Sequence, residues 1–272
     1  RYTMAEQRQM KAIEKRIIIL ISSAIILSIF MVFKGNTFTD NIIHFVSFSI
    51  ASTIIIYDLY VRFLMVPRGP RVTNIFYQIC DFMSLFAIVC LSFQLFASFF
   101  YFRATVEGTS MVPTLQNEDD LMVRSTKKVN HFDIIVVQLN DRYNIIVPGV
   151  ENGDLLVKRV IGIPGDSFYF KDDILYLNEQ KIDEAYLKDE FGEFYYGGGL
   201  RDFDLEKYCQ IKGENVCPES GECVIPEDYY FVMGDNRTNS NDSKTFGLFH
   251  KSQIFGIVKY RIRGIFNWEK VE

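Results

Sequence analysis

Long apolar runs occupy roughly the first hundred positions of the chain, whereas short alternating runs occupy the remainder. The first run, residues 17–33, carries no charged side chain. A helix of that length just crosses a hydrocarbon core of about 30 Å, at about 1.5 Å of rise per residue. A second run covers 43–66 and is interrupted by Asp58 and Arg62, and a third covers 82–102. The pattern predicts about three transmembrane segments, of which the second is the least regular.

The first apolar run can also be interpreted as a cleaved signal peptide, because Arg8, Lys11, Lys15 and Arg16 form a positively charged segment before it. The sequence FKGNTFTD that follows the run has no convincing small-residue cleavage site, and two further apolar runs come after it. These features favour a membrane anchor.

Positive charge near the segments predicts their orientation, since short cytoplasmic loops keep Lys and Arg. Lys and Arg are concentrated before the first segment, the next connection has only Lys34, and the following one carries Arg68 and Arg71. We therefore expect a cytoplasmic N-terminus and, after three crossings, an extracytoplasmic domain. If the second segment lies at the membrane surface instead, the later residues would be cytoplasmic.

The pattern changes after the anchor, residues 1–103, to short β-branched and aromatic runs between clusters of Gly, Pro, Asn and Asp. Strands are predicted at 120–123, 133–139, 155–161, 167–170, 174–177, 229–233 and 254–262. Residues 181–224 lack this regularity and are expected to form an inserted lobe. The predicted fold class is N-terminal transmembrane α-helices followed by a mostly β extracytoplasmic domain, residues 104–272.

Composition narrows the possible partners and cofactors. A formal charge of -5 and a pI near 5.4 argue against a nucleic-acid-binding protein, which normally shows a basic surface. Cys209, Cys217 and Cys223 cluster in the expected extracytoplasmic part, where they permit one disulfide and leave one thiol over. The alternative, three thiolates on one metal ion, lacks a nearby histidine. We expect no metal and no cofactor.

Hydrolytic chemistry needs a nucleophile and a base, and histidine is a poor candidate for the base in this chain. Only His44, His131 and His250 occur, and neither a G-x-S-x-G nor an H-E-x-x-H motif is present. A lysine can act as a base when burial keeps it neutral. Lys158 in LLVKRVIG is the candidate, because strand alternation places it on the face of Leu156 and Val160.

Two further segments carry polar groups suited to catalysis. VEGTSMVPTLQNEDD is a small, proline-bounded turn that exposes the hydroxyl of Ser110. MGDNRTNSNDSKTFG follows an apolar strand and is dense in hydrogen-bonding side chains, which suits a scaffold for a neutral amine. Each segment alone is also compatible with an ordinary solvated loop.

Taken together, the order and spacing of these segments resemble the characteristic boxes of bacterial type I signal peptidases, a serine-lysine peptidase family. The matching segments are GTSMVPTL, KRVIGIPGD and GDNRTNSNDSKTFG, with FDIIVV similar to the strand between the first two boxes, and the resemblance covers about residues 106–262. It implies that Ser110 attacks the scissile carbonyl and that Lys158 removes its proton.

The same resemblance implies supporting roles for other residues of the boxes. Ser240 and Asp242 would hold the lysine amine, and Gly108, Met111 and Pro113 would shape the substrate groove. Two ion pairs, Asp235 with Arg159 and Asp242 with Lys244, would brace the site.

Two positions depart from the family pattern. Gly108 stands where some members have a hydroxyl residue that donates to the oxyanion, so the backbone N–H of Ser110, or another donor, must serve. Lys244 stands where arginine is common, which replaces a bidentate fork by a point charge.

The resemblance implies an enzyme of the cytoplasmic membrane that removes signal peptides from secretory preproteins after an Ala-x-Ala-like site. Its partners would be these preproteins and the lipid bilayer, with no nucleic acid. Trp268 near the C-terminus suits either a membrane contact or an ordinary strand.

Three alternatives to this interpretation are less consistent with the sequence. A soluble self-cleaving repressor would lack the apolar runs, and a catalytically inactive binding or assembly module would be expected to lose Ser110 or Lys158. A lipoprotein-type signal peptidase would use intramembrane aspartates such as Asp58 and Asp81. That reading leaves the polar boxes unexplained.

Overall fold

The structure is a computed structural model that describes residues 4–33, 53–62, 70–188, 193–194, 203–212, 217, 223–264 and 267–271. The chain divides into two compact units, Arg1–Phe100 and Tyr101–Glu272. The division lies just before the boundary that the sequence predicts between residues 103 and 104. It falls there because the chain turns from helix into a sheet-forming strand at Tyr101.

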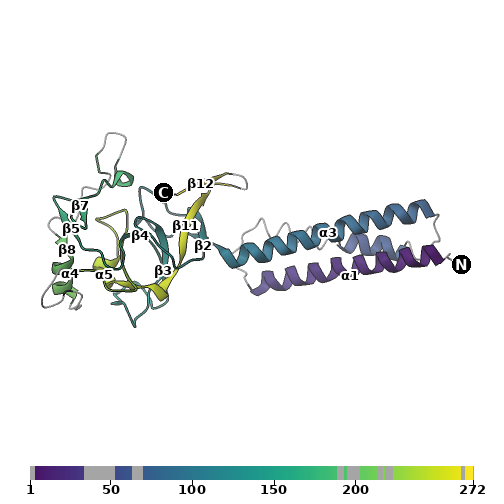
Figure 1. The fold of residues 1–272 in the computed structure, drawn as a ribbon, viewed down its shortest axis with the longest axis horizontal. Helices are drawn as coiled ribbons and strands as arrows, with labels where there is room; N and C mark the ends of the chain where they lie inside the picture. The colour runs from purple at the N-terminus through teal and green to yellow at the C-terminus, as the bar shows by residue number, and fades with distance from the viewer. Residues whose placement is uncertain are drawn as a thin grey trace. The chain divides into compact units, whose positions relative to one another are not determined.

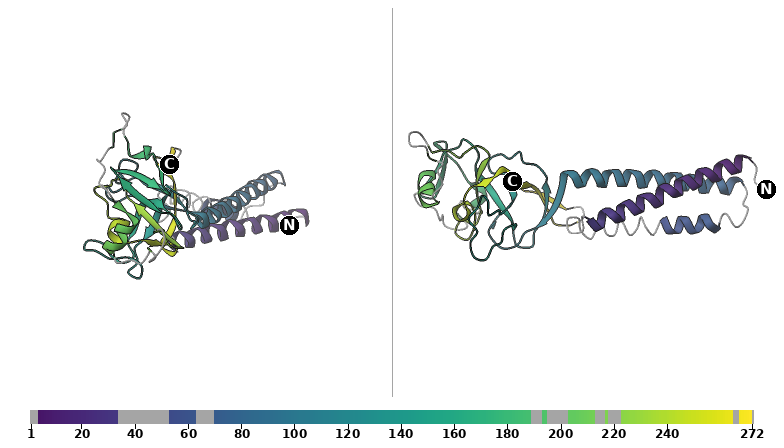
Figure 2. Two further views of the ribbon diagram at one scale, coloured as in Figure 1. Left: turned by 60° about the vertical axis from the view of Figure 1, so that its left-hand side comes forward. Right: turned by 90° about the horizontal axis from the view of Figure 1, so that it is seen from below.

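The first unit is helical. It contains α1 (Met4–Phe33), a helical stretch at 53–62, and α3 (Pro70–Phe100), and the views in Figures 1 and 2 show α1 and α3 side by side. One cluster of buried apolar side chains in this unit consists of Ile13, Ile17, Leu20, Ile56, Cys80 and Ala87. The third apolar run is thus part of a longer helix that begins before residue 82. Residues 43–52 and 63–66 of the second run lie outside the described residues.

One stretch of the described residues, Pro70–Phe93, is long and apolar enough to cross a membrane, with a mean hydropathy of 1.8. This stretch includes the start of the third predicted segment. A crossing by the first or second segment stays a prediction.

The two aspartates among the described residues of the helical unit are each paired with an arginine. Asp81 accepts a hydrogen bond from Arg16 Nε at 2.8 Å, and the same guanidinium donates to the Tyr77 hydroxyl at 3.0 Å. Asp58 lies 2.8 Å from Arg62 Nε, one helical turn further along. Both carboxylates therefore have an evident structural role, which removes the reason to assign them catalysis.

The second unit is mostly β, as predicted, and is built on an antiparallel eight-stranded sheet (Figure 1). Its strands are β1 (Tyr101–Thr105), β2 (Asp120–Arg124), β3 (Ile134–Gln138), β4 (Leu155–Gly162), β9 (Tyr229–Met233), β10 (Phe249–His250), β11 (Ile254–Ile262) and β12 (Trp268–Lys270). They lie in the order β1-β2-β11-β3-β4-β9-β10, and β12 pairs with β11. β1 was not predicted, since its aromatic residues continue the preceding apolar run.

A smaller antiparallel sheet has the order β7-β6-β5-β8. It consists of β5 (Phe168–Lys171), β6 (Ile174–Leu177), β7 (Gln180–Lys181) and β8 (Phe203–Asp204). The helical segments of this unit are η1 (Ala185–Leu187), α4 (Leu205–Lys212), α5 (Ser243–Phe246) and η2 (Lys251–Gln253). All seven predicted strands are confirmed, with ends within about one residue. Among the described residues of the predicted lobe, β8 pairs with β5 of the smaller sheet.

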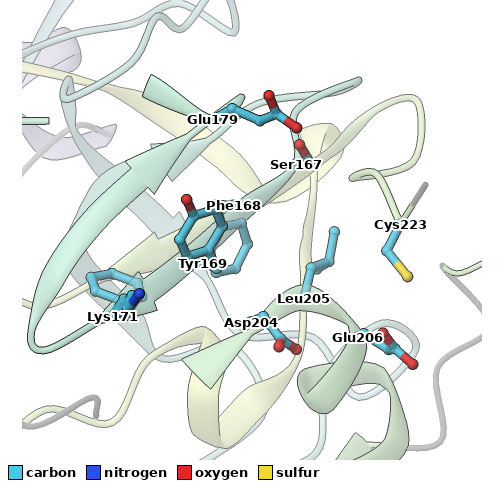
Figure 3. A pocket seen from close by; sticks show the side chains of 10 residues that line it. Ser167, Phe168, Tyr169, Lys171, Glu179, Asp204, Leu205, Glu206 and Cys223 are labelled. Carbon is cyan, nitrogen blue, oxygen red and sulfur yellow. The ribbon is translucent and has the colours of Figure 1, made fainter. Parts of the chain in front are cut away.

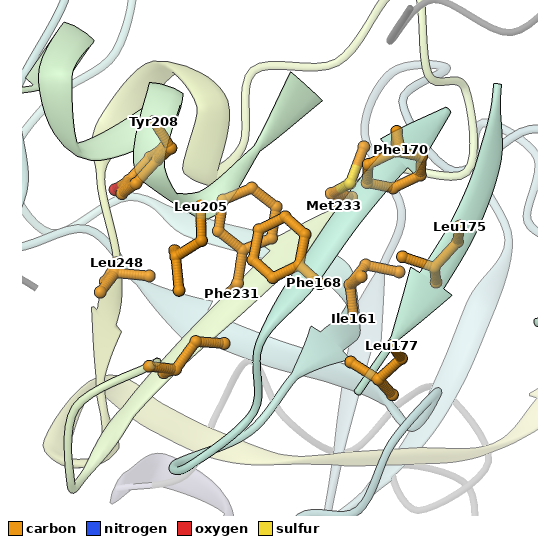
Figure 4. Close-up of a cluster of buried hydrophobic side chains, with 11 residues drawn as sticks. Ile161, Phe168, Phe170, Leu175, Leu177, Leu205, Tyr208, Phe231, Met233 and Leu248 are labelled. Carbon is orange, nitrogen blue, oxygen red and sulfur yellow. The ribbon is translucent and has the colours of Figure 1, made fainter. Parts of the chain in front are cut away.

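An aromatic cluster joins the two sheets (Figure 4). Phe168 of β5 packs against Phe231 of β9 with ring centroids 4.5 Å apart, and Tyr208 of α4 meets Phe231 edge-on at 5.4 Å. Ile161 of β4 is fully buried in the same cluster. The smaller sheet is therefore packed against β4, which carries Lys158, and against β9, which leads into the polar segment MGDNRTNSNDSKTFG.

A disulfide links Cys217 to Cys223 beside this cluster. The sequence permits one bridge within the cysteine group without deciding whether it forms, and the structure contains one. With two of the three thiols bonded to each other, a three-thiolate metal site is excluded. The side chain of Cys209 lies outside the described residues.

Candidate active site

The turn that carries Ser110 lies between β1 and β2, at one edge of the main sheet. The backbone N–H of Val106 donates to Asp119 O at 2.9 Å, and Glu118 N–H donates to Val106 O at 2.8 Å, which closes the turn. Met111, 1% exposed, anchors its middle in an apolar cluster. The serine therefore sits on a loop that is tied at both ends and packed at its centre.

The three predicted groove residues lie on this turn but differ in exposure. Gly108 is exposed, has φ 88°, and its N–H donates to Asn117 Oδ1 at 2.8 Å. Pro113 is half-buried, whereas Met111 faces the core. The left-handed backbone at Gly108 explains the glycine, because a side chain is rarely accommodated there.

Lys158 reaches the serine from β4, the central strand beside β3 and β9. Its Nζ donates to Ser110 Oγ at 2.8 Å and to the carbonyl of Val157 at 3.0 Å. Ile135 is its partner across β3, and both Ile135 and Val160 belong to one buried cluster, as the alternation predicts. The structure thus brings the predicted nucleophile and base into direct contact.

Burial sets the charge state of this amine. Lys158 is 3% exposed, and burial lowers its pKa from 10.5 to about 8. The carboxylates of Asp242 and Asp235 oppose the shift, and the ammonium of Lys244 adds to it. A pKa near 8 leaves a useful fraction of the lysine neutral at physiological pH, which a general base requires.

Asp235, in the loop after β9, forms a buried ion pair with Arg159. Arg159 Nε and Nη2 donate to its two carboxylate oxygens at 2.9 and 2.8 Å, and neither side chain is more than 1% exposed. Thr114 Oγ1 donates to the same carboxylate at 2.5 Å. The bidentate pair therefore connects β4 to the loop after β9, and Thr114 connects the same carboxylate to the turn that carries Ser110.

Asp242 organises the end of the same loop. Its carboxylate accepts hydrogen bonds from Gly234 N–H at 3.0 Å and Lys244 N–H at 3.1 Å, the latter as the cap of α5. Lys244 Nζ lies 3.7 Å from the carboxylate and donates to Arg237 O at 2.8 Å. The expected ion pair between Asp242 and Lys244 is present, but the hydrogen bond of the Lys244 amine goes to the carbonyl of Arg237.

Ser240 is placed differently from the role that the resemblance implies. Its Oγ is buried and has no hydrogen-bond partner among the described residues, while the Lys158 amine is engaged by Ser110 and Val157. A Cβ added at Gly234 would lie 2.2 Å from Ser240 Oγ and 2.4 Å from Ser110 O. Ser240 thus adjoins the serine turn across Gly234 without holding the amine.

The two described histidines lie in structural contacts. His131 Nε2 is 2.6 Å from Asp166 Oδ2, and the side chain of His250 caps η2 by accepting from Ser252 N–H. His44 lies outside the described residues. The rejection of a base role for His131 and His250 agrees with these partners.

No pattern in the sequence indicates the second buried ion pair, which lies beside the site. Glu184, just before η1, is bound by both terminal nitrogens of Arg237, and the Tyr186 hydroxyl donates to the same carboxylate at 2.6 Å. Burial alone would lower the pKa of Arg237, but Glu184 outweighs that effect and raises it. Arg237 therefore stays charged although both side chains of the pair are at most 5% exposed.

Tyr186 connects this pair to the first one. The guanidinium of Arg159 stacks on its ring at 3.8 Å from the centroid, a cation–π contact. Burial and the charge of Glu184 raise the pKa of Tyr186 well above its ordinary value, so the hydroxyl stays a donor. Glu184 and Tyr186 come from the irregular part of the sequence, and no motif marked them.

A pocket of about 520 Å³ lies elsewhere, on the smaller sheet (Figure 3). It is lined by β5, the start of α4 and Cys223, with Tyr169 and Lys171 on one side and Asp204 and Glu206 on the other. None of the residues predicted for catalysis lines it. Its size alone does not make it the active site.

A family model described as signal peptidase, peptidase S26, matches residues 79–263. The chain belongs to this family. Signal peptidase I of Bacillus caldolyticus is 36% identical over 180 residues, which cover 65% of this chain and 86% of the relative. Signal peptidase IB of Staphylococcus aureus is 37% identical over 163 residues, or 58% of this chain and 75% of the relative. A solved signal peptidase I from Enterococcus faecalis is 33% identical, covers 49% of this chain and 98% of that chain, and has a TM-score of 0.35.

Membership of the signal peptidase family makes the chain a serine hydrolase of the type I signal peptidase class. The matched region contains Ser110, Lys158 and the loop after β9. It also contains Glu184 and Tyr186, so the charge network described above lies within the region that this family shares.

We expect Glu184→Gln to destabilise the protein by about 3 kcal/mol or more, because it leaves the buried guanidinium of Arg237 without a counter-charge. Thermal unfolding of the full chain in detergent measures the loss. Asp183→Asn is the matched control: it removes the same charge one residue earlier, from a pair with Lys188 that is largely exposed, and should cost less than about 1 kcal/mol. Equal losses in the two variants would contradict a special role for the buried pair.

Proposed function

We propose that the chain removes N-terminal signal peptides from exported preproteins, with Ser110 as the nucleophile and Lys158 as the general base. The observation that carries the proposal is the 2.8 Å contact between the Ser110 hydroxyl and a lysine amine that is 3% exposed. The family supports the reaction class, and the contact supports these two residues as its agents. An intact dyad also favours an enzyme over an inactive binding module of the same fold.

The proposed reaction proceeds in two steps. Ser110 Oγ attacks the carbonyl carbon of the scissile bond while its proton moves to the neutral Nζ of Lys158. The resulting ammonium returns that proton to the leaving nitrogen, which frees the mature protein and leaves the signal peptide as an ester. A water molecule then gives its proton to Lys158, attacks the ester carbonyl and restores the serine.

The oxyanion of each tetrahedral intermediate needs a hydrogen-bond donor. Gly108 has no side chain to supply one, and the backbone N–H of Ser110 donates to no acceptor among the described residues. We assign the oxyanion to this N–H. Its position on the nucleophilic residue keeps the donor close to the carbonyl that Ser110 attacks.

We further propose that the cleavage site carries small residues, Ala-x-Ala-like, at its end. An extended peptide that pairs with a strand presents alternate side chains to the same face, so two shallow pockets would read two positions. Gly108 and Pro113 lie on the accessible side of the serine turn and suit the wall of such a groove.

A membrane location is the final part of the proposal. The apolar helix α3 ends at Phe100, and only nine residues separate Phe100 from Ser110. We propose a multi-pass anchor with a cytoplasmic N-terminus and the catalytic unit outside the cytoplasmic membrane. This arrangement places the serine near the surface from which a preprotein emerges.

Ser110→Ala and Lys158→Met should each lower the cleavage of a preprotein peptide with an Ala-x-Ala end by about 10³-fold or more, since residues of one catalytic unit fail together. Mass spectrometry of the products gives both the rate and the position of the cut. Ser125→Ala and Lys171→Met, both at exposed positions, serve as controls and should cleave normally. Undiminished cleavage by either dyad variant would refute the assignment.

The pH profile of kcat/KM should rise about tenfold per pH unit and level off near pH 8, because only neutral Lys158 accepts the serine proton. Lys244→Met should move the midpoint to higher pH, since the Lys244 charge lowers the pKa of Lys158. Lys251→Met removes an exposed charge that is paired with Asp228 and should leave the midpoint unchanged. If the midpoint of kcat/KM is the same in Lys244→Met as in the unchanged chain, the titrating base is not Lys158.

Fusions of alkaline phosphatase, which is active only after export, test the topology in cells. Fusions after Asp40 and after Glu272 should be active, and a fusion after Gly69 should be inactive. A cytoplasmic fluorescent protein at the same three sites should show the reverse pattern. An inactive phosphatase after Glu272 would place the catalytic unit in the cytoplasm and overturn the three-crossing arrangement.

A further inference from the structure

Asn236 ties the serine turn to the loop after β9 through two consecutive carbonyl groups. Its backbone N–H donates to Ser110 O at 3.0 Å, and its side-chain Nδ2 donates to Thr109 O at 3.2 Å. The residue is 4% exposed, although Thr109 itself lies at the surface. Neither the proposed proton transfers nor the two buried ion pairs use this residue.

The orientation of the Asn236 amide is itself held in place. Thr238 Oγ1 donates to Asn236 Oδ1 at 3.3 Å, which directs the NH₂ end of the amide toward Thr109. The backbone N–H of Asn239 donates to Asn236 O at 3.1 Å and closes the local turn. The amide is therefore presented to the serine turn in one orientation.

Geometry links this contact to the oxyanion donor. The peptide bond between Thr109 and Ser110 is trans, so the C=O of Thr109 and the N–H of Ser110 point in opposite directions. Two hydrogen bonds hold the Thr109 carbonyl, one from Asn236 Nδ2 and one from Val112 N–H, each at 3.2 Å. The bond from Asn236 directs the carbonyl toward the loop after β9 and so helps to aim the Ser110 N–H away from Asn236. The second bond from Asn236, to Ser110 O, fixes the next peptide plane, while the Ser110 side chain remains free to meet Lys158.

Gly234 makes this approach possible. A Cβ at this position would lie 2.4 Å from Ser110 O, a contact that backbone atoms cannot relieve without moving. The chain leaving β9 can therefore pass the serine turn closely enough for Asn236 to reach both carbonyls.

We propose that Asn236 is a positioning residue that aims the backbone N–H of Ser110 at the oxyanion of the tetrahedral intermediate. The inference rests on the proposed function, in which Ser110 is the nucleophile. It adds a residue whose effect should be felt in the transition state and not in substrate binding.

Asn236→Ala removes the side-chain donor and keeps the backbone bond to Ser110. We expect kcat to fall about 10- to 100-fold with KM changed less than about twofold, because a misdirected donor weakens only charge stabilisation. Asn236→Asp keeps the volume but sets a carboxylate oxygen against the Thr109 carbonyl, and should lose at least as much. Asn239→Ala is the control: this exposed side chain reaches only Thr109 Oγ1, at 3.4 Å, and its loss should leave kcat unchanged.

A peptide aldehyde with an Ala-x-Ala-like end separates positioning from general damage. Ser110 Oγ bonds to the aldehyde carbon, the carbonyl electron pair moves to oxygen, and the serine proton passes to Lys158, so the adduct carries an oxyanion. Its inhibition constant should rise in Asn236→Ala by about the same factor as kcat falls. The affinity of the uncleaved peptide for a Ser110→Ala background should not depend on residue 236.

The outcomes are distinct. Wild-type kcat in Asn236→Ala, a loss confined to KM, or an unchanged aldehyde affinity overturns the inference. If Asn236→Ala does not fold, as judged by circular dichroism, the isosteric Asn236→Asp decides by the same criteria. Cleavage that persists in Ser110→Ala would instead refute the proposed function itself.

Discussion

The structure of the site depends on one constraint: a lysine amine must be buried beside a serine hydroxyl, with no carboxylate bound to it that would stabilise its charged form. Lys158 meets this condition because it lies on a central strand, where the apolar sheet excludes water. Its hydrogen bonds go to a hydroxyl and a carbonyl, which accept from an amine without carrying a full charge. The carboxylates of Asp235 and Asp242 act on it only at a distance, and each is engaged elsewhere.

That constraint explains why so much charge is buried nearby. A free Asp235 beside Lys158 would favour the ammonium form, and the bidentate contact with Arg159 offsets its charge. The guanidinium of Arg159 in turn lies on the ring of Tyr186, whose hydroxyl is bonded to Glu184. The two buried ion pairs are thus joined through the neutral Tyr186, and a charge of either pair would be costly to leave without its partner.

The loop after β9 has a second task, which is to shape the backbone of the serine turn. Gly234 permits close approach, Asn236 binds two carbonyls, and Asp242 caps α5 while it binds the Gly234 N–H. The polar side chains of this segment therefore bind mainly backbone N–H and C=O groups. Ser240, which the family resemblance assigns to the amine, makes no such bond in this structure.

The sequence by itself determined seven strands and the segments that carry Ser110 and Lys158, because β-branched alternation and a glycine- and proline-bounded turn are local signals. The pairing of these two residues, and of Arg159 with Asp235, came from the resemblance of the motifs to a known family. It missed β1, whose aromatic residues continue an apolar helix, and the short strands β7, β8, β10 and β12, which are too brief to show an alternating pattern. Only the tertiary structure decided that Glu184 binds Arg237, that Tyr186 packs on Arg159, and that Asn236 binds two carbonyls of the turn that carries Ser110. The reason is that these contacts join residues separated by 27 to 127 positions, and ordinary Glu, Tyr and Asn side chains carry no local pattern that reveals a distant partner.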